Sequence, residues 1–368
     1  MEFMLLNTVI YFGGVYVLKR GERKIKFTFP ILTLNKGGAQ RMLVDITNDL
    51  VGRGHDVTIL MPKNSNNEYD IRSKVIYGKN VRFLTADDYP NSDIIVSNFF
   101  TTVDSAHQAS QNGKGLHIRF SLCYEPIFLP DQPLSFKSYY KAPYLVVLSK
   151  YQQELIRILH GLTGQIVPIY VNPNFKNLNI RNNDEVLRIS AIVRMPEGGW
   201  AWHRDQDYLL QQLSIVKNKY PHIQINLICP PNEFAISQNL QNISKNSFRF
   251  ITPSNDPELC NIYSQSDIFV TSSIYEAAPL PGLEAMKCGA ALAAVYAGGN
   301  LEYCRHEENC LMSYRHESRL ASDIIRLIEN PVLRSQLAKK GQQDAEQWTL
   351  QRSSSAFEQI CVSALKDL

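Results

Sequence analysis

Residues 24–172 alternate between short apolar runs and helical patterns. KIKFTFPIL predicts a strand, and apolar residues from Ala39 to Leu50 then recur at the i, i+3, i+4, i+7 spacing of a helix with one buried face. DVTILM is the next predicted strand, so this segment is a strand–helix–strand unit with a parallel, right-handed crossover. The further predicted strands are VRFLT, SDIIVSN, LHIRFSL, PYLVVLS and QIVPIYV.

The pattern breaks at the polar, Asn-rich residues 171–185 and then starts again. The strands predicted after the break are LRISAIVR, IQINLIC, FRFIT, DIFVTSS and AALAAV, with helices between them and a helical tail. A length of 368 residues also fits two domains at about 150 residues each. We therefore expect two α/β domains, residues 24–172 and 173–348, followed by a last helix in residues 349–368. The default ligand site of such domains lies at the carboxyl ends of their strands.

The first 23 residues are treated apart from the fold. FMLLNTVIYFGGVYVL is shorter than the ~20 residues that a membrane-spanning helix needs. No positive charge precedes it and no small-residue cleavage site follows it, so it does not resemble a signal peptide. Two interpretations stay open: an extra element ahead of the first domain, or a shallow membrane anchor helped by the basic residues at 19–24.

Charge and cysteine content narrow the class of protein. Lys and Arg total 38 against 35 Asp and Glu, a formal net charge of +3, which excludes a dedicated nucleic-acid binder. Seven dispersed cysteines without a CxxC pair favour a reduced, cytoplasmic protein. Peripheral contact with the inner face of the plasma membrane is expected if residues 1–23 act as an anchor. Cys304, His306 and Cys310 lack a fourth ligand at zinc spacing, so we expect no metal there.

The chemistry is expected to concentrate in residues 267–304. A predicted strand ends near Ser273, the following loop carries Glu276, and the next helix carries Glu284. Two carboxylates so placed can accept charge-assisted hydrogen bonds from a polyol. The alternative is that both are helix-entry carboxylates favoured by the helix dipole.

A glycine pair follows these glutamates. We expect Gly298-Gly299-Asn300 to open a further helix, whose backbone amides can approach a phosphate closely. Hydroxyl-binding carboxylates together with phosphate-binding amides suit a nucleotide-sugar.

This stretch resembles the carboxyl-terminal domain of family 4 retaining glycosyltransferases of the GT-B fold. The family pattern is E-x7-E, EAMxCG, a GG pair and an acidic residue, matched by Glu276, Glu284 to Gly289, Gly298-Gly299 and Glu302. LNKGGAQRMLVDITNDLVGRGHDVTIL and CYEPIF are similar to the family's amino-terminal GGAxR loop and to the YEP loop of its rhamnosyltransferase-like branch. The resemblance spans about residues 24–365. It implies an α/β GT-B protein whose two Rossmann-like, doubly wound domains face a cleft, with the last helix crossing back to the first domain.

The resemblance also implies roles for individual residues. Glu276 would face the donor sugar as a catalytic residue, and Glu284 would bind the ribose hydroxyls. The other residues that it places in the donor site are Gly37, Gly38, Thr252, Ser273, Pro279, Leu280, Gly298, Gly299 and Asn300. Gly37 and Gly38 can equally be only a strand-to-helix turn. Ala277-Ala278-Pro279 departs from the family's glycine and aromatic residue, which leaves sugar specificity open.

The family grips the donor diphosphate with an Arg and a Lys. Arg194 matches the first position, and Arg204 is the candidate for the second, with a solvated charge at a helix start as the alternative. Two such cations can neutralise a departing diphosphate without a metal. Asp205-Gln206-Asp207 spells a DxD motif, but we expect it to cap a helix rather than bind a cation.

The acceptor side is less well marked. Many relatives have a catalytic histidine where this chain has Leu122 or Cys123, and His117 is expected in the core, so no catalytic histidine is assigned. Tyr124 and Glu125 are expected to face the acceptor, with loop capping as the alternative for Glu125. Trp200 and Trp202 can line the ligand site or cover a domain edge.

The predicted function is retaining sugar transfer from a nucleoside-diphosphate sugar, UDP-linked and with UDP-glucose as first candidate, to a glycan or lipid-linked acceptor in polysaccharide biosynthesis. We expect no cofactor, no metal and no nucleic-acid partner. Two alternatives remain: a nucleotide-sugar epimerase of the same architecture, and a non-catalytic nucleotide-sugar-binding module.

Overall fold

The computed structural model describes residues 24–128, 132–181, 186–245 and 248–367. The predictions for residues 1–23 therefore lie outside the described residues. Contacts divide the chain into two compact units, Met1–Ser97 with Thr101–His117, and Asn98–Phe100 with Ile118–Leu368. The candidate site described below lies within the second of these units.

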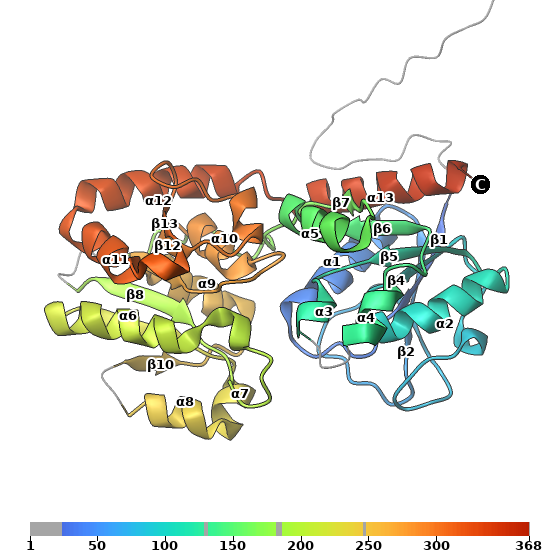
Figure 1. The fold of residues 1–368 in the computed structure, drawn as a ribbon, viewed down its shortest axis with the longest axis horizontal. Helices are drawn as coiled ribbons and strands as arrows, with labels where there is room; N and C mark the ends of the chain where they lie inside the picture. The colour runs from blue at the N-terminus through green and yellow to red at the C-terminus, as the bar shows by residue number, and fades with distance from the viewer. Residues whose placement is uncertain (1–23, 129–131, 182–185, 246–247, 368) are drawn as a thin grey trace, which may run out of the picture. The chain divides into compact units, whose positions relative to one another are not determined.

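The first half of the chain builds a seven-stranded parallel sheet in the order β3-β2-β1-β4-β5-β6-β7 (Figure 1). Its strands are β1 (Lys26–Pro30), β2 (Asp56–Met61), β3 (Lys74–Tyr77), β4 (Ile94–Ser97), β5 (Leu116–Phe120), β6 (Tyr144–Val147) and β7 (Gln165–Ile166). The helices here are α1 (Gly38–Gly52), α2 (Phe100–Gln111), α3 (Glu125–Phe128), α4 (Gln132–Ser138) and α5 (Lys150–His160), with a 3-10 turn η1 (Ala86–Asp88).

The second half builds a six-stranded parallel sheet in the order β10-β9-β8-β11-β12-β13. Its strands are β8 (Arg188–Ile192), β9 (Gln224–Ile228), β10 (Arg249–Ile251), β11 (Ile268–Thr271), β12 (Ala291–Val295) and β13 (Leu311–Ser313). Its helices are α6 (Gln206–Lys219), α7 (Pro231–Ile236), α8 (Gln238–Ile243), α9 (Asp256–Gln265), α10 (Leu280–Lys287), α11 (Leu320–Glu329) and α12 (Pro331–Ala345). Its 3-10 turns are η2 (Trp202–Arg204), η3 (Gly299–Glu302) and η4 (Arg315–Glu317).

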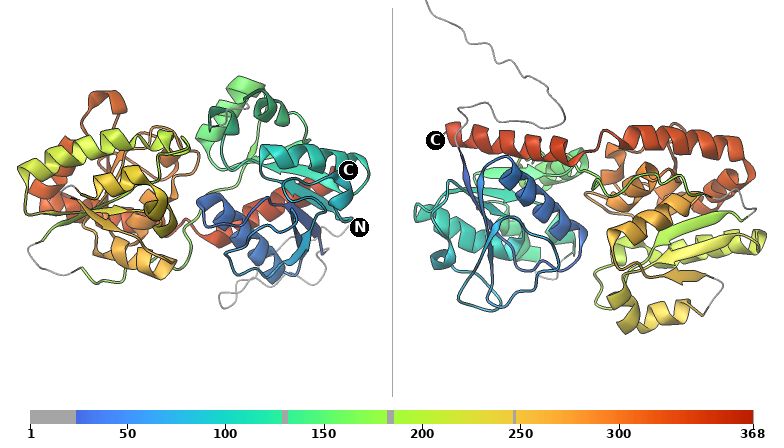
Figure 2. Two further views of the ribbon diagram at one scale, coloured as in Figure 1. Left: turned by 90° about the horizontal axis from the view of Figure 1, so that it is seen from below. Right: turned by 180° about the vertical axis from the view of Figure 1, so that it is seen from behind.

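The core of the second sheet explains why its strands read as continuous apolar runs. Every residue of β12, ALAAV, is buried, because helices flank both faces of the sheet (Figure 2). Side chains of α6 and α11, including Leu213 and Ile324, join the same hydrophobic cluster as residues of β8, β9, β11 and β12. The strand order reverses between β8 and β11, which makes their carboxyl ends the expected place for a ligand.

The chain ends in α13 (Leu350–Lys366), which begins at a Thr349 cap. Phe357 of this helix is fully buried and stacks on Phe120 of β5, with ring centroids 5.4 Å apart. The Tyr144 hydroxyl of β6 donates to the Ala364 carbonyl at 3.4 Å. The last helix therefore packs against strands contributed by the first half of the chain.

The two parallel-sheet, Rossmann-like domains predicted from the sequence are confirmed, whereas several local predictions are wrong. VRFLT is no strand, and its Val81 and Phe83 are exposed. The edge strand β3 is not among the predicted strands. β7 is only two residues long; Val167 N still donates to Val147 O, but Pro168 after it has no N–H to continue the ladder. Between β7 and β8, the described residues form no helix or strand, and the predicted boundary at 171–185 stays a prediction.

Within the described parts of the chain, no helix combines the length and the apolar character that crossing a membrane requires.

Candidate active site

The loop after β11 is fixed by backbone pairing to the loop after β12. Glu276 N donates to Ala297 O at 2.8 Å, and Gly299 N donates to Glu276 O at 2.8 Å. A Cβ on Gly299 would lie 2.2 Å from the Ala277 carbonyl oxygen, so only glycine permits this approach. The two loops that carry Glu276 and the glycine pair thus hold each other in place.

The Glu276 carboxylate is anchored through one of its two oxygens. Oε1 accepts from the Ser273 hydroxyl at 3.3 Å, and it lies 3.5 Å from His203 Nε2 and 3.8 Å from Arg204 Nη1. Oε2 has no partner within the described residues, and 16% of the side chain is exposed. One oxygen is therefore held by the protein, and the other is available to accept from a ligand hydroxyl.

The charge of this carboxylate is maintained although burial alone would raise its pKa. The nearby Arg204 charge and the interaction with His203 outweigh burial and hold the pKa of Glu276 below its ordinary value. Glu276 is consequently an ionised acceptor at neutral pH.

Arg204 comes from η2 and reaches the same edge of the sheet. The Ser272 hydroxyl, just after β11, donates to the Arg204 carbonyl at 2.6 Å, which ties η2 to this strand. A small pocket lies here, lined by Ile192, Arg204, Phe269, Val270, Thr271, Ser272, Ser273 and Pro281. The structure brings Arg204, Ser273 and Glu276 together, as expected for one ligand site.

His203 lies beside Arg204, Ser273 and Glu276, although it was not predicted from the sequence as a site residue. It is 9% exposed, and its ring packs edge-on against Phe128 with centroids 5.0 Å apart. It matches no position of the E-x7-E, EAMxCG or GG patterns. The only available signal was its place directly before Arg204.

Glu284 lies on α10, one turn after its start, and is 8% exposed. The Tyr263 hydroxyl lies 3.5 Å from its Oε2. Burial, Cys304 and Cys310 raise the pKa of Tyr303 strongly, and the charges of Glu276 and Glu284 raise it further. Both glutamates therefore lie within electrostatic reach of one tyrosine, whose hydroxyl donates to Pro279 O at the start of α10.

Arg194 follows β8 and is held by Glu233 of α7. Its Nε lies 2.8 and 2.9 Å from the two carboxylate oxygens, and its Nη2 also pairs with Glu233. Burial would raise the pKa of Glu233, but the hydrogen bonds from Arg194 and from Met195 N hold that pKa below its ordinary value. Arg194 Nη1 has no partner within the described residues. Glu233, which the sequence did not indicate, thus orients the guanidinium and leaves one side of it available.

The glycine pair differs from the expectation. Gly298 has φ +87°, and η3 is a single 3-10 turn rather than an α-helix, so no helix N-terminus forms there. The Gly299 N–H is already committed to Glu276 O. The Asn300 side chain bonds to the backbone of Ala297 and Val295, which shapes the loop from inside. The glycine pair therefore allows the two loops to pack closely. The Gly299 N–H, which was expected to bind a phosphate, donates to the Glu276 carbonyl instead.

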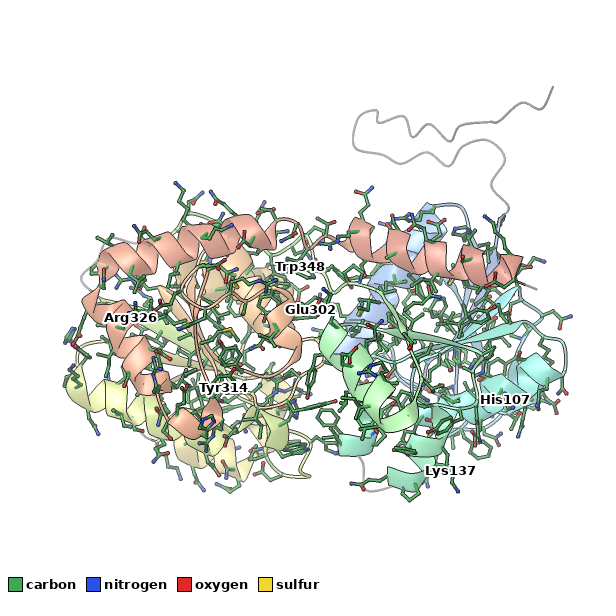
Figure 3. The ribbon with its side chains drawn as sticks, turned by 45° about the horizontal axis from the view of Figure 1, so that its top comes forward. His107, Lys137, Glu302, Tyr314, Arg326 and Trp348 are labelled. Carbon is green, nitrogen blue, oxygen red and sulfur yellow. The ribbon has the colours of Figure 1, made fainter. Side chains whose placement is uncertain are left out.

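Glu302 ends η3 and accepts from Lys150 N at the start of α5 at 2.8 Å (labelled in Figure 3). A Cβ on Gly298 would lie 2.5 Å from the Tyr151 ring of the same helix. The loop after β12 is thus in close contact with α5.

The remaining predicted donor residues are placed as follows. Pro279 precedes α10, Leu280 begins it, and Thr252 follows β10, half-buried. Gly37 and Gly38 lie in the first compact unit at the start of α1, where the Tyr69 hydroxyl bonds to the backbone N and O of Gly37. Their roles toward a donor stay predictions.

Tyr124 and Glu125, expected on the acceptor side, have internal partners instead. Glu125 is 1% exposed, pairs with the buried Arg119 and accepts from the Tyr139 hydroxyl at 3.1 Å. Tyr124 is buried, and its hydroxyl lies 3.0 Å from His160 Nε2. In this structure both side chains are therefore part of a buried polar cluster rather than of a surface that an acceptor can touch.

Cys123, one of the two residues expected at the place of the family's histidine, lies within electrostatic reach of Glu276. Burial and the charges of Glu125 and Glu276 raise the pKa of its thiol. The thiol is therefore protonated at neutral pH.

The DxD motif is explained by an ion pair. Asp205 occupies the cap position of α6, as expected, but its carboxylate caps no N–H and pairs with Arg315. The Arg315 guanidinium also lies 3.7 Å from the Tyr208 ring centroid. Across the described parts of the chain, no three His, Cys, Asp or Glu side chains gather closely enough to hold a metal ion.

Comparison with solved structures identifies the fold class. Sucrose-phosphate synthase from Thermosynechococcus elongatus superposes with a TM-score of 0.75 at 14% identity, covering 92% of this chain and 98% of that one. The Anabaena protein Alr3699/HepE, in complex with UDP and glucose, also gives 0.75, at 17% identity over 92% of this chain and 100% of that one. The fold class is GT-B, as the sequence predicted.

Sequence comparison matches one part of the chain to a protein family. Residues 200–344, less than half of the chain, match the family model of glycosyl transferases group 1. Arg204, Glu276 and Glu284 lie inside the matched residues, and Arg194 lies before them.

Two curated relatives match part of the chain. One, from Campylobacter jejuni, is N,N'-diacetylbacillosaminyl-diphospho-undecaprenol alpha-1,3-N-acetylgalactosaminyltransferase, 26% identical over 187 residues, or 49% of this chain and 46% of that protein. The other is an uncharacterized glycosyltransferase from Haemophilus influenzae, 24% identical over 197 residues, or 52% of this chain and 53% of that protein. The chain thus spans about half the length of the curated relatives it matches.

Proposed function

We propose that this protein is a glycosyltransferase that moves a sugar from a nucleoside-diphosphate sugar to a glycan or lipid-linked acceptor in polysaccharide biosynthesis. The observation that carries the proposal is the Glu276 carboxylate, anchored through Oε1 beside Arg204 with Oε2 left for a ligand. It lies where the strand order reverses, within the residues that match the group 1 family.

In the proposed mechanism, Glu276 Oε2 accepts a hydrogen bond from a hydroxyl of the donor sugar, and Glu284 accepts from the ribose hydroxyls. Arg204 and the available Nη1 of Arg194 bind the diphosphate. The bond between the anomeric carbon and the diphosphate oxygen breaks, and the acceptor oxygen bonds to the same face of the sugar. The acceptor proton passes to the departing phosphate oxygen, so the configuration is retained. Arg194 and Arg204 supply the positive charge that stabilises the departing diphosphate, without a metal.

The donor and acceptor are proposed from the relatives. UDP-glucose is the first donor to test, because Alr3699/HepE was solved with UDP and glucose. A lipid-linked acceptor fits the name of the Campylobacter jejuni relative, which specifies a diphospho-undecaprenol compound. Peripheral membrane contact of this chain follows from such an acceptor and belongs to the same proposal.

A thermal-shift panel of UDP-, GDP- and dTDP-glucose tests the proposal. A ligand that binds only the folded protein stabilises it by about 2.7 kcal/mol at a hundredfold excess over Kd, so UDP-glucose should raise the Tm clearly. The Glu284→Ala variant, with an affinity about tenfold weaker, should lose about half of that stabilisation. If none of the nucleotide sugars changes the Tm of the wild type, the proposed donor is wrong. UDP-glucose turnover to another UDP-sugar without any acceptor would instead indicate an epimerase.

A further inference from the structure

We propose that His203 is a positioning residue of the donor site, which fixes the Glu276 carboxylate so that its Oε2 faces the sugar. This inference rests on the proposed function, because it concerns how the same site holds the sugar part of its donor. His203 acts through Glu276 and is not itself given a contact with the sugar.

Both the backbone and the ring of His203 engage the loop that carries Glu276. Ile274 N donates to the His203 carbonyl at 2.9 Å, and the ring Nε2 lies 3.5 Å from Glu276 Oε1. The ring also packs against Phe128, perpendicular to it at a centroid distance of 5.0 Å. With Ser273 at 3.3 Å from the same oxygen, the carboxylate is held from two directions.

The partners of the two ring nitrogens assign the proton to Nε2. Nε2 faces a carboxylate oxygen, whereas Nδ1 is buried with no hydrogen-bond partner in the described residues. An added proton at Nδ1 would bury an N–H without an acceptor, which is costly. His203 Nε2 therefore serves as a hydrogen-bond donor to Glu276 Oε1, beside the positive charge of Arg204.

The other titratable or charged groups within electrostatic reach of Glu276 are Arg194, Arg204, Cys123 and Tyr303. Of these four, only Arg204 contacts Glu276 Oε1, at 3.8 Å, which is farther than His203 at 3.5 Å. Loss of the His203 N–H would leave Oε1 with Ser273 and the more distant Arg204, so the carboxylate could rotate about its side-chain bonds. Oε2 would then no longer be held toward the sugar.

Isothermal titration of UDP and of UDP-glucose into the full chain tests this assignment. His203→Phe keeps a ring against Phe128 but removes the donor, and His203→Gln restores an N–H near the position of Nε2. We expect His203→Phe to weaken UDP-glucose binding about tenfold, the size of one charge-assisted hydrogen bond, and to leave UDP binding unchanged. His203→Gln should recover most of the loss.

A double-mutant cycle separates positioning from general damage. In a Glu276→Ala background, His203→Phe should have no further effect on UDP-glucose affinity. An equal loss for UDP and UDP-glucose, or a loss that persists in the Glu276→Ala background, would overturn the role of His203.

Failure of the proposed function gives a different result, because the wild type would then bind neither UDP nor UDP-glucose. In that case the ligand-free protein still decides the inference through 15N spectra of labelled histidine. The His203 signal, identified by its absence in His203→Phe, should show a proton on Nε2, and it should shift in Glu276→Gln. A His203 signal that does not respond to Glu276→Gln, or that shows no proton on Nε2, contradicts the contact.

Discussion

At the scale of single residues, the two glutamates of the E-x7-E spacing have different surroundings. Glu276 lies in a loop with a partially exposed carboxylate, whereas Glu284 lies on a helix and is almost fully buried beside Tyr263. The proposal gives them different parts of the donor, and their variants should therefore differ in kind.

Glu284→Ala should weaken UDP binding about tenfold, because it removes a charged acceptor for the ribose hydroxyls. Glu276→Ala should leave UDP affinity nearly unchanged and reduce UDP-glucose turnover. Isothermal titration with UDP and a coupled assay of UDP release measure the two effects. Equal UDP affinity of the wild type and Glu284→Ala would refute the ribose assignment.

Arg204→Ala should change the pH dependence of UDP-glucose binding. Burial raises the pKa of Glu276, and Arg204 is the largest of the opposing influences that hold that pKa low. Without Arg204 the pKa rises, so the carboxylate becomes protonated at a higher pH and affinity is lost earlier as pH falls. Isothermal titrations of UDP-glucose between pH 4 and 8 measure the pH at which affinity falls on the acid side of the profile, called the acid limb below.

Arg204→Lys is the matched control, because it retains the positive charge. Its acid limb should stay close to that of the wild type, although its phosphate contact is weaker without a planar fork. The same acid limb in the wild type and in Arg204→Ala would show that Arg204 does not hold Glu276 in its charged form.

The sequence could indicate only part of this site. Glu276 and Ser273 were predictable because they follow an apolar strand, and Arg204 was predictable through the resemblance to the family's diphosphate grip. His203 and Glu233 were not, because each becomes relevant only when a segment distant in the chain, the loop of Glu276 or the end of β8, comes beside it. Glu125 looked like an acceptor residue at a strand end, but the sequence does not reveal that Arg119 points to it inside the core.

At the scale of elements, the long periodic segments were predictable and the short ones were not. VRFLT has the composition of a strand, yet Val81 and Phe83 face solvent, and the chain enters η1 instead. β3 is a half-buried edge strand of four residues with a charged end, which weakens its hydrophobic signal. The turn at Gly298 depends on the close approach of Ala277 and Tyr151, contacts that no local pattern encodes.

Gly299→Ala should destabilise the protein by about 1–3 kcal/mol, the usual cost of adding a methyl group to a packed site. The added Cβ would meet the Ala277 carbonyl at 2.2 Å and force the two loops apart. Urea denaturation measures the loss, and UDP-glucose affinity should fall with it because Glu276 moves.

Gly52→Ala provides the control, since nothing lies within 4 Å of a Cβ at this position in α1. Alanine is the better helix former, so this variant should be as stable as the wild type or slightly more so. If Gly299→Ala were equally well tolerated, the close loop packing described here would be wrong.

At the scale of the whole molecule, the chain's last helix is part of its core. α13 buries Phe357 against Phe120 of β5, and the Tyr144 hydroxyl of β6 bonds to its carbonyl end. The fold of the first half of the chain therefore depends on residues at the end of the sequence.

Phe357→Ala should lower the free energy of unfolding by about 3–5 kcal/mol, the range for removing a buried aromatic ring. Differential scanning calorimetry should show a lower Tm for the whole transition. Ser363→Ala, on the exposed side of the same helix, should leave it unchanged. A normal Tm for Phe357→Ala would mean that α13 contributes little to the core.

The account as a whole depends on a nucleotide sugar bound at the ends of β8 and β11. The electron density of a crystal of this protein grown with UDP-glucose tests that most directly. The account predicts a glucose hydroxyl within hydrogen-bond distance of Glu276 Oε2, the ribose at Glu284 and the diphosphate at Arg204. Density for the ligand away from these three side chains, with Glu276 Oε2 facing water, would contradict it.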